Sequence, residues 1–243
     1  MEEQLRTVAN ILKDSRIVVA LTGAGISAES GIPTFRGKDG LWKKYRAEDL
    51  ATPFAFQRNP KLVWEWYVWR MNIISKARPN PAHIVLAEME KEGILRAVIT
   101  QNVDGLHFKA GSKNVIELHG NIWRIRCVDC NWKTVLNSPP TQIPPICERC
   151  GGLMRPDVVW FYESLPQDAL NKAFKLAAQS DLMLVIGTSG VVQPAASLPL
   201  ITKNQGGILV EINVADTPLT LVCHYSLRGK AGEILPRIYK YLK

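Results

Sequence analysis

The sequence has no stretch suited to crossing a membrane, because none of its apolar runs approaches the roughly 20 residues that a spanning helix needs. Its first residues, 1–6, lack the basic and apolar segments of a secretory signal peptide. Internal repeats, low-complexity tracts and basic tails are absent as well. From these absences we expect a cytoplasmic protein with no membrane partner.

Composition and charge set weaker limits on the protein. Its 243 residues suffice for one large domain or one domain with a small insert, and 47% hydrophobic with 21% charged residues is ordinary for a globular enzyme. The formal net charge of +8 favours acidic partners and nonspecific contact with nucleic acid. The basic residues are scattered, however, so a merely basic surface explains the charge equally well.

Short apolar runs alternate along the chain with segments of helical periodicity. The runs expected as buried strands are 16–21, 95–100, 114–118, 181–186 and 207–212. The segments expected as helices are 2–13, 61–77, 81–91, 105–110, 166–179 and 231–242. Residues 36–60, which contain several glycines and prolines, are expected to be irregular. The alternation predicts an α/β fold with a doubly wound parallel sheet, which binds ligands at the carboxyl ends of its strands.

A glycine-rich stretch over residues 23–37 follows the first apolar run. Its start, Gly23-x-Gly25-x-x-Ala28, fits the turn of dinucleotide folds in which N–H groups at a helix start hold a pyrophosphate. The pair Phe35-Arg36 shortly after it is unusual for a plain dehydrogenase. The stretch therefore indicates a dinucleotide site whose chemistry needs another explanation.

Four of the five cysteines form two Cys-x-x-Cys pairs, Cys127 with Cys130 and Cys147 with Cys150. Four thiolates match tetrahedral zinc, and a shell closed by four cysteines leaves no position for a substrate, so the metal is expected to be structural. A small module held by zinc also explains why residues 121–156 show no clear periodicity. Free core thiols, or a zinc ribbon that binds nucleic acid, are the alternatives.

Polar residues follow two of the expected strands. Residues 101–104, Gln-Asn-Val-Asp, come after one strand, and His119 comes after the next. Asn and Asp side chains can hydrogen-bond ribose hydroxyls or an amide, and a histidine can act as general base. The alternative makes Asp104 a helix cap and His119 a loop residue. The histidines without comparable context are His83, His107 and His224.

Together these motifs occur in the order and spacing of the sirtuin family, and the chain resembles a compact, prokaryotic-type sirtuin core over essentially all of its length. The motifs are Gly23-Ala24-Gly25-Ile26-Ser27, Gly31-Ile32-Pro33-Thr34-Phe35-Arg36, Gln101-Asn102-Val103-Asp104, His119-Gly120, the two cysteine pairs, Gly187-Thr188-Ser189 and Glu211-Ile212-Asn213. Sirtuins are NAD-dependent protein-lysine deacylases. The resemblance implies a Rossmann-type large domain over 1–35, 80–120 and 157–243, and a small domain made of a helical module, 36–79, and a zinc module, 121–156.

The resemblance also implies the binding sites for one NAD, as cosubstrate, and one structural Zn²⁺. NAD and an acyl-lysine peptide would meet in the cleft between the two domains. The nicotinamide ribose and carboxamide would contact Gln101, Asn102 and Asp104, and the adenosine half would contact Gly187, Ser189, Asn213 and Ala231. The remaining residues implied to line the NAD site are Gly23, Ala24, Gly25, Ser27, Phe35, Arg36, Val103 and Thr188. The implied zinc ligands are Cys127, Cys130, Cys147 and Cys150.

In the implied reaction, nicotinamide leaves as the acyl oxygen attacks C1′ of the ribose. His119 then acts as general base on a ribose hydroxyl, which attacks the resulting alkylamidate. The products are the free lysine, nicotinamide and O-acyl-ADP-ribose. Phe35 would shield the reactive face of the ribose from water, and the zinc would take no part.

The protein substrate is implied to pair, as an added strand, with the backbone of Val158, Val159, Trp160 and Phe161. Tyr162 departs from the family pattern, which usually has Gly at this position, so the local turn and its peptide preference are expected to differ.

Tyr67 and Arg70 share one face of the expected helix 61–77, because they stand three residues apart. A phenol and a guanidinium fork together make a good receptor for a carboxylate. Tyr-x-x-Arg at this place resembles the sirtuin subgroup that removes succinyl and malonyl groups, so we expect these acyl groups to be removed in addition to acetyl. A surface arginine is the alternative.

Other classes of protein share parts of this pattern. A nicotinamide dehydrogenase would leave the zinc module and Phe35-Arg36 unexplained. A protein mono-ADP-ribosyltransferase would use the same NAD site, and a noncatalytic zinc-ribbon protein would fit the basic charge but needs neither His119 nor NAD. The expected partners are acyl-lysine proteins or peptides, nucleic-acid-associated proteins among them, and we expect a monomer.

Overall fold

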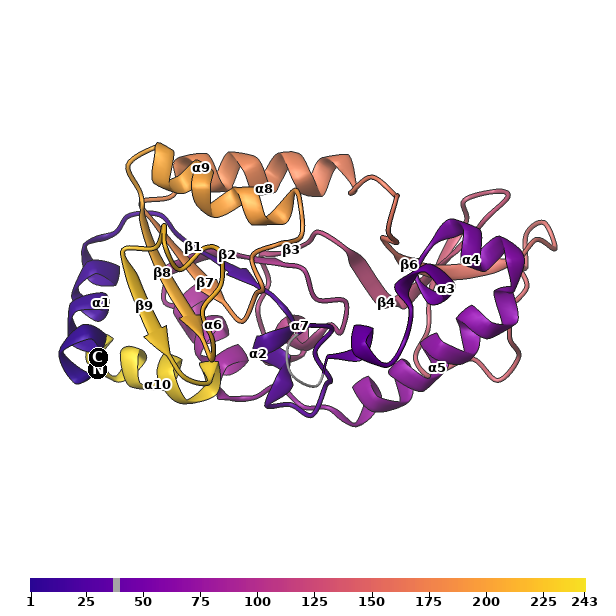
Figure 1. Ribbon diagram of the computed structural model, residues 1–243, viewed down its shortest axis with the longest axis horizontal. Coiled ribbons are helices and arrows are strands. Elements are labelled where there is room, and N and C mark those ends of the chain that lie inside the picture. The colour runs from indigo at the N-terminus through magenta and orange to yellow at the C-terminus, as the bar shows by residue number, and fades with distance from the viewer. Residues whose placement is uncertain (37–39) are drawn as a thin grey trace.

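The larger of the two lobes of the molecule is built on a six-stranded sheet of order β3-β2-β1-β7-β8-β9, in which all neighbouring strands are parallel (Figure 1). The computed structural model describes residues 1–36 and 40–243, so Gly37, the last residue of the glycine-rich stretch, lies outside the described residues. The strands are β1 Val18–Thr22, β2 Leu95–Thr100, β3 Val115–Glu117, β7 Leu182–Ile186, β8 Ile208–Asn213 and β9 Tyr225–Arg228. The predicted doubly wound parallel sheet is confirmed.

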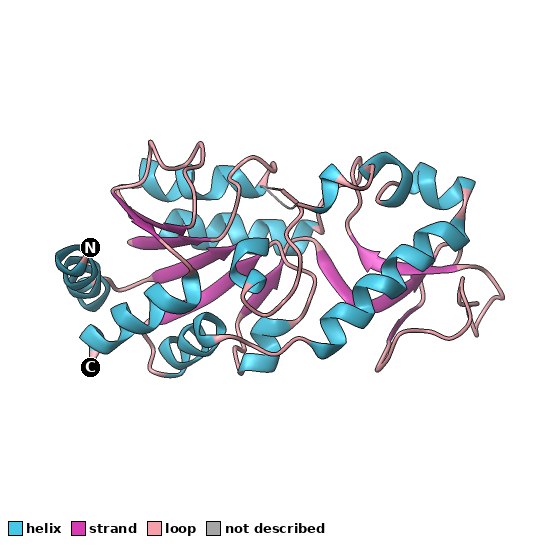
Figure 2. Cartoon of the chain, turned by 60° about the horizontal axis from the view of Figure 1, so that its bottom comes forward, coloured by secondary structure: helices cyan, strands magenta, loops and turns pink. Residues whose placement is uncertain are grey.

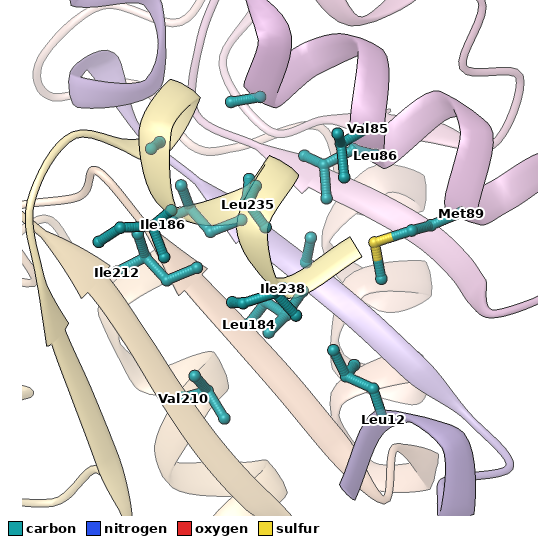
Figure 3. Packing of buried hydrophobic residues seen from close by; sticks show 14 of the residues in the cluster. Leu12, Val85, Leu86, Met89, Leu184, Ile186, Val210, Ile212, Leu235 and Ile238 are labelled. Carbon is teal, nitrogen blue, oxygen red and sulfur yellow. The ribbon is translucent and has the colours of Figure 1, made fainter. Parts of the chain in front are cut away.

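Helices cover both faces of this sheet, which is why its central strands are continuously apolar. One face packs against α1 Glu2–Asp14, α6 Pro81–Lys91 and α10 Ala231–Leu242; the other packs against α8 Gln167–Gln179 and α9 Leu198–Asn204. Strand β7 contributes to both cores by alternation: Leu184 faces α10, whereas Met183 and Val185 face α8 and α9. Figure 3 shows Leu184 and Ile186 packed with Leu235 and Ile238 in the first of these cores.

Strand β9 was not predicted. It forms one edge of the sheet, and of its four residues only Leu227 is buried. An edge strand that is half exposed has no need of the apolar run that marks the central strands, so the sequence carries no strong signal for it.

The smaller lobe combines a three-stranded antiparallel sheet of order β5-β4-β6 with a group of helices. Its strands are β4 Gly120–Cys127, β5 Lys133–Val135 and β6 Met154–Val158, and its helices are the 3₁₀ turn η1 Leu41–Lys43, α3 Ala47–Leu50, α4 Pro53–Arg58 and α5 Pro60–Lys76. Both parts share one apolar core, in which Trp64 and Met71 of α5 pack with Ile122 and Met154 of the sheet. The indole N–H of Trp64 also donates to the carbonyl of Met154 at 2.9 Å.

The prediction that residues 36–60 are irregular was wrong for the part that the structure describes, because this segment contains η1, α3 and α4. Pro53 occupies the first position of α4, where a missing N–H costs nothing, so this proline begins a helix and does not break one. Thr52 precedes it and accepts a hydrogen bond from the N–H of Ala55 at 3.0 Å, which completes a helix cap.

The two lobes lie at opposite ends of an elongated molecule, and both termini lie together at the end of the large lobe (Figures 1 and 2). Two short helices, α2 Ala24–Ala28 and α7 Leu106–Ala110, lie between the two sheets (Figure 1). The 3₁₀ turn η2 Ala195–Ser197 precedes α9. None of the helices within residues 1–36 and 40–243 is long and apolar enough to cross a membrane.

Candidate functional site between the lobes

The site begins where β1 and β7, neighbours at the centre of the large sheet, reach their carboxyl ends. From β1 the chain continues to β2 on one side, and from β7 it continues to β8 on the other, so this is the switch point at which such sheets bind ligands. Gly25 donates its N–H to the carbonyl of Gly187 at 2.8 Å, and Gly23 donates to Ile186 at 3.0 Å. A Cβ on Gly25 would lie 2.7 Å from the Cα of Gly187, so the glycines are required by this close approach.

A hydrogen-bonded cluster of polar side chains lies beside the glycine turn. Asn102 donates to the carbonyl of Gly23 at 3.1 Å and to the hydroxyl of Ser27 at 3.2 Å, and Ser27 donates to Asp104 at 2.8 Å. Burial raises the pKa of Asp104, and hydrogen bonds from the Leu106 N–H and from Ser27 oppose this effect. The Leu106 bond, at 2.8 Å, pairs the first N–H of α7, although the N-cap position itself is held by Gly105 and not by Asp104.

His119 stands between β3 and β4, facing the same region. Its Nδ1 lies 3.0 Å from the carbonyl oxygen of Gln101. Because a carbonyl can only accept, Nδ1 carries the proton, and Nε2 is left as the basic nitrogen. Burial lowers the pKa of His119, and the bond to Gln101 opposes this only in part, so the imidazole is neutral at pH 7 and able to take up a proton.

The residues predicted for the adenosine half come together at the ends of β7 and β8. Asn213 donates to the carbonyl of Thr188 at 2.8 Å, and Gln101 donates to the hydroxyl of Thr188 at 2.9 Å. Ser189 follows directly and is half-buried. Ala231 lies at the start of α10, and its neighbour Gly232 donates its N–H to Glu29, at the end of α2, at 2.7 Å.

An aromatic cluster surrounds Arg70 of α5. The guanidinium lies 4.7 Å from the ring centroid of Phe35 and 4.9 Å from that of Trp66, and only 7% of the residue is exposed. Burial lowers the pKa of Arg70 despite the opposing influence of Tyr67 and Asp104. Among the described residues, no carboxylate forms an ion pair or hydrogen bond with this guanidinium. Tyr67 is buried too, and its hydroxyl accepts a hydrogen bond from the indole of Trp160 at 2.8 Å.

Phe35 itself packs on Trp42, with ring centroids 5.1 Å apart, so the end of the glycine-rich stretch contacts the small lobe. Arg36 is exposed, and its carbonyl accepts a hydrogen bond from Thr34 at 2.9 Å. Ala24 opens α2, whereas Val103 contacts β4 through its carbonyl, which accepts from Ile122 at 2.9 Å.

Backbone donors in residues 158–161 are largely in use within the chain. Val159 donates to the carbonyl of His119 at 2.9 Å, Trp160 to the carboxylate of Glu163 at 2.8 Å, and Phe161 to the carbonyl of Ala51 at 2.9 Å. Within the described part of the chain, the next backbone N–H groups without a partner are those of Tyr162 and Ser164. The N–H groups of residues 159–161 are therefore not free to pair with another strand.

The four cysteines of the two pairs converge in the small lobe, with all four sulfur atoms within 4.8 Å of one another. The Sγ atoms of Cys127 and Cys150 are 3.5 Å apart, and those of Cys130 and Cys147 are 3.7 Å apart. Tetrahedral zinc with Zn–S bonds of about 2.3 Å holds its sulfurs about 3.8 Å apart, so this donor set fits zinc. The closed shell supports the structural role that was predicted.

Two buried histidines belong to this region and were not singled out by the sequence. The rings of His83 and His107 lie 4.9 Å apart; Nε2 of His83 is 3.5 Å from Ser27, and Nε2 of His107 is 3.0 Å from Thr22. Burial lowers the pKa of His83 to about 4 and that of His107 to about 3, so both rings are neutral. The one signal for His83 is its place three residues after Asn80, with which it forms a capping box at the start of α6.

Comparison with known proteins agrees with this geometry. Residues 23–194 match the Sir2 family. A protein of Pyrococcus furiosus named NAD-dependent protein deacylase is 58% identical over 245 residues, covering 98% of each chain. A solved Sir2 homologue in complex with NAD superimposes with a TM-score of 0.93 at 53% identity, over 97% of this chain and 93% of that one. A complex of Sir2 with a p53 peptide and NAD⁺ superimposes with a TM-score of 0.88 at 39% identity, over 96% of each chain.

Proposed function

This chain belongs to the Sir2 family, and from that premise we propose that it removes acyl groups from protein lysines in an NAD-dependent reaction that yields nicotinamide, O-acyl-ADP-ribose and the free lysine. The observation that carries the proposal is His119, whose Nδ1 is held by the carbonyl of Gln101, at the carboxyl ends of β1 and β2, so that Nε2 is left as a neutral, basic nitrogen. A dehydrogenase would leave the four-cysteine cluster and Phe35 unexplained, and a noncatalytic zinc-ribbon protein needs no neutral histidine at such a place.

We propose that NAD binds along the carboxyl ends of β1, β2, β7 and β8. The close contact of Gly25 with Gly187 brings two backbones to the surface where a pyrophosphate would lie. Asn102 and Asp104 are positioned, through Ser27, for the ribose and carboxamide of the nicotinamide half. Asn213 and Ser189 are assigned to the adenosine half, where no acidic residue is needed to hold the ribose. The large domain would then be 1–35, 80–120 and 157–243.

The acyl-lysine peptide would lie between that domain and the small one, formed by modules 36–79 and 121–156. In this position its acyl group reaches His119 past the backbone of Val158–Phe161, since Val159 is hydrogen-bonded to the carbonyl of His119. His119 then takes a proton from a ribose hydroxyl, which makes that oxygen a nucleophile toward the acyl carbon. Phe35, packed on Trp42 above the turn, would exclude water from the reacting atoms.

Arg70 supports a preference for acidic acyl groups. A guanidinium that is buried among aromatic rings, with no carboxylate partner among the described residues, is a costly feature that a ligand carboxylate would relieve. The hydroxyl of Tyr67, held by Trp160, is the second group available to such a ligand. We therefore assign succinyl and malonyl lysine, in addition to acetyl lysine, as substrates.

Replacing Arg70 by methionine tests this assignment. A charge-assisted hydrogen bond contributes roughly 1.5–3 kcal/mol, so KM for a succinyl-lysine peptide should rise by about 10- to 150-fold while deacetylation is largely retained. Steady-state kinetics with matched acetyl and succinyl peptides give both values. Arg70→Lys is the matched control, because it keeps the charge but not the fork and should lie between wild type and Arg70→Met. An equal decrease in kcat/KM for both peptides would show that Arg70 does not bind the acyl group.

Acetyl-, succinyl- and malonyl-lysine peptides incubated with NAD, and analysed by mass spectrometry, test the function itself. The expected products are deacylated peptide, nicotinamide and O-acyl-ADP-ribose in equal amounts. A protein mono-ADP-ribosyltransferase, the second candidate for the same NAD site, would instead leave ADP-ribose attached to the peptide or to an added protein.

We further propose a cytoplasmic monomer whose substrates include nucleic-acid-associated proteins. The formal net charge of +8, which favours acidic partners, supports only the choice of substrates.

A further inference from the structure

The turn that follows the proposed peptide strand has an unexpected residue at its tightest position. The carbonyl of Trp160 accepts a hydrogen bond from the N–H of Glu163 at 3.1 Å, which closes a four-residue turn. Tyr162, the third residue of this turn, has a φ of 71°, in the left-handed region where type II turns normally place glycine. The turn is held in this shape by the carboxylate of Glu163, which accepts from Arg155 at 2.5 Å and from the N–H of Trp160 at 2.8 Å.

No packing contact of Tyr162 within the described residues offsets the cost of its left-handed backbone conformation. The residue is 79% exposed, so burial of the ring contributes little to folding. The ring's one aromatic neighbour among the described residues is Phe54 of α4, itself 67% exposed, with ring centroids 6.4 Å apart. A strained residue that the fold does not need is typical of a ligand-contacting position, and two exposed rings side by side form an apolar surface without a partner in the chain.

The aromatic pair lies where a bound peptide would leave the proposed strand site. Phe161, directly before Tyr162, bonds through its N–H to Ala51, three residues from Phe54. Because the N–H groups of Val159, Trp160 and Phe161 are in use within the chain, the nearest backbone donors without a partner, among the described residues, are those of Tyr162 and Ser164. The adjacent carboxylate of Glu163 is already bound to Arg155 and Arg126, so it offers no free charge to a cation. The surface therefore suits an apolar side chain.

We propose that Tyr162 and Phe54 form a subsite that binds a large apolar side chain of the substrate peptide, within three residues of the acyl-lysine. The proposal rests on the deacylase function and adds a sequence preference to it. At about 3.3 Å per residue in an extended strand, a side chain three residues from the acyl-lysine lies about 10 Å from it, which sets the range of positions to test.

The test compares acetyl-lysine peptides that carry Leu or Ala at each of the three positions on either side of the modified lysine. In the wild-type enzyme, kcat/KM should favour Leu at one of these positions by about 5- to 20-fold, the size expected for partial burial of one apolar side chain. Tyr162→Gly should bring that ratio close to 1, mainly through KM. Its melting temperature should stay the same or rise, because glycine adopts the left-handed conformation without strain.

Further variants separate a subsite from a mere turn residue. Asparagine adopts the same backbone conformation but lacks the ring, so Tyr162→Asn should also lose the preference for the Leu peptide. Tyr162→Phe should keep that preference. Phe54→Ala should lower the ratio, and Leu221→Ala, at a residue 91% exposed near β9, should not. The proposal is overturned if Tyr162→Gly retains the wild-type ratio of kcat/KM for the Leu peptide over the Ala peptide. It is also overturned if kcat/KM falls equally for both peptides while the melting temperature falls. If wild-type enzyme does not deacylate any peptide, the deacylase function fails, not the subsite.

Discussion

Replacing His119 by alanine should lower kcat/KM for deacylation by about 10²–10⁴-fold, the usual contribution of a general base, while the fold is retained. The ring is positioned by one hydrogen bond in the described structure, from Nδ1 to the carbonyl of Gln101, so its removal costs little stability. Initial rates with an acetyl-lysine peptide and NAD, together with a thermal melt, separate the two effects.

His224→Asn is a suitable control for the His119 variant. Nδ1 of His224 accepts a hydrogen bond from the N–H of Leu209 at 2.9 Å, on β8 and away from the glycine turn, so this change should leave deacylation intact. His119→Asn adds a second comparison, since its amide can still donate to Gln101 but has no basic nitrogen. Near-normal turnover in either His119 variant would refute its role as the base.

The pH dependence follows from the same ring. A general base must be neutral, and burial lowers the pKa of His119 below its ordinary value of about 6.5. In a plot of kcat/KM against pH, the decrease on the acid side should therefore have its midpoint below pH 6.5. The residual activity of His119→Ala should not show that decrease. A decrease that persists unchanged in the variant would have to be assigned to another group.

The central sheet could be predicted because its strands are buried on both faces and therefore read as continuous apolar runs. Strand β9 and the sheet β5-β4-β6 were not predicted, because their strands are partly exposed and carry no continuous apolar run. In β5, for example, two of three residues are exposed. The strand is defined by its pairing with β4, and its sequence shows no apolar pattern. Pro53 and Pro60 were taken as breakers, although each begins a helix behind a polar cap.

The candidate site divides in the same way. Residues that end or follow a strand, such as His119, Asn102 and Asn213, could be expected at one edge of the sheet because parallel strands bring their carboxyl ends together. Tertiary burial has no such local signal, and so the sequence gives no reason to expect that His83 and His107 form a buried, neutral pair next to Ser27. The sequence marks Tyr162 as unusual, but its exposure and its contact with Phe54 depend on α4, about 100 residues away along the chain.

Removing the zinc should unfold the small lobe and lower the melting temperature by more than about 10 °C. Each kcal/mol is worth about 2–4 °C in a chain of this size, and structural zinc contributes several kcal/mol. The loop between β5 and β6 has few apolar residues of its own, so the four thiolates must hold it. The core shared with α5 contains Cys127, Cys147 and Met154. Loss of the zinc should therefore also loosen the packing of the helices in this lobe.

Two routes to the zinc-free protein make this test decisive. Chelation and Cys147→Ser should both lower zinc content from one atom per chain, with parallel losses in near-UV circular dichroism and in melting temperature. Cys223→Ser is the matched control, because that thiol lies apart from the cluster and should change neither quantity. Deacylation should be lost only as the lobe unfolds, since the closed shell leaves no position for substrate. A zinc-free protein that melts normally but has lost activity would instead give the metal a direct part in the chemistry.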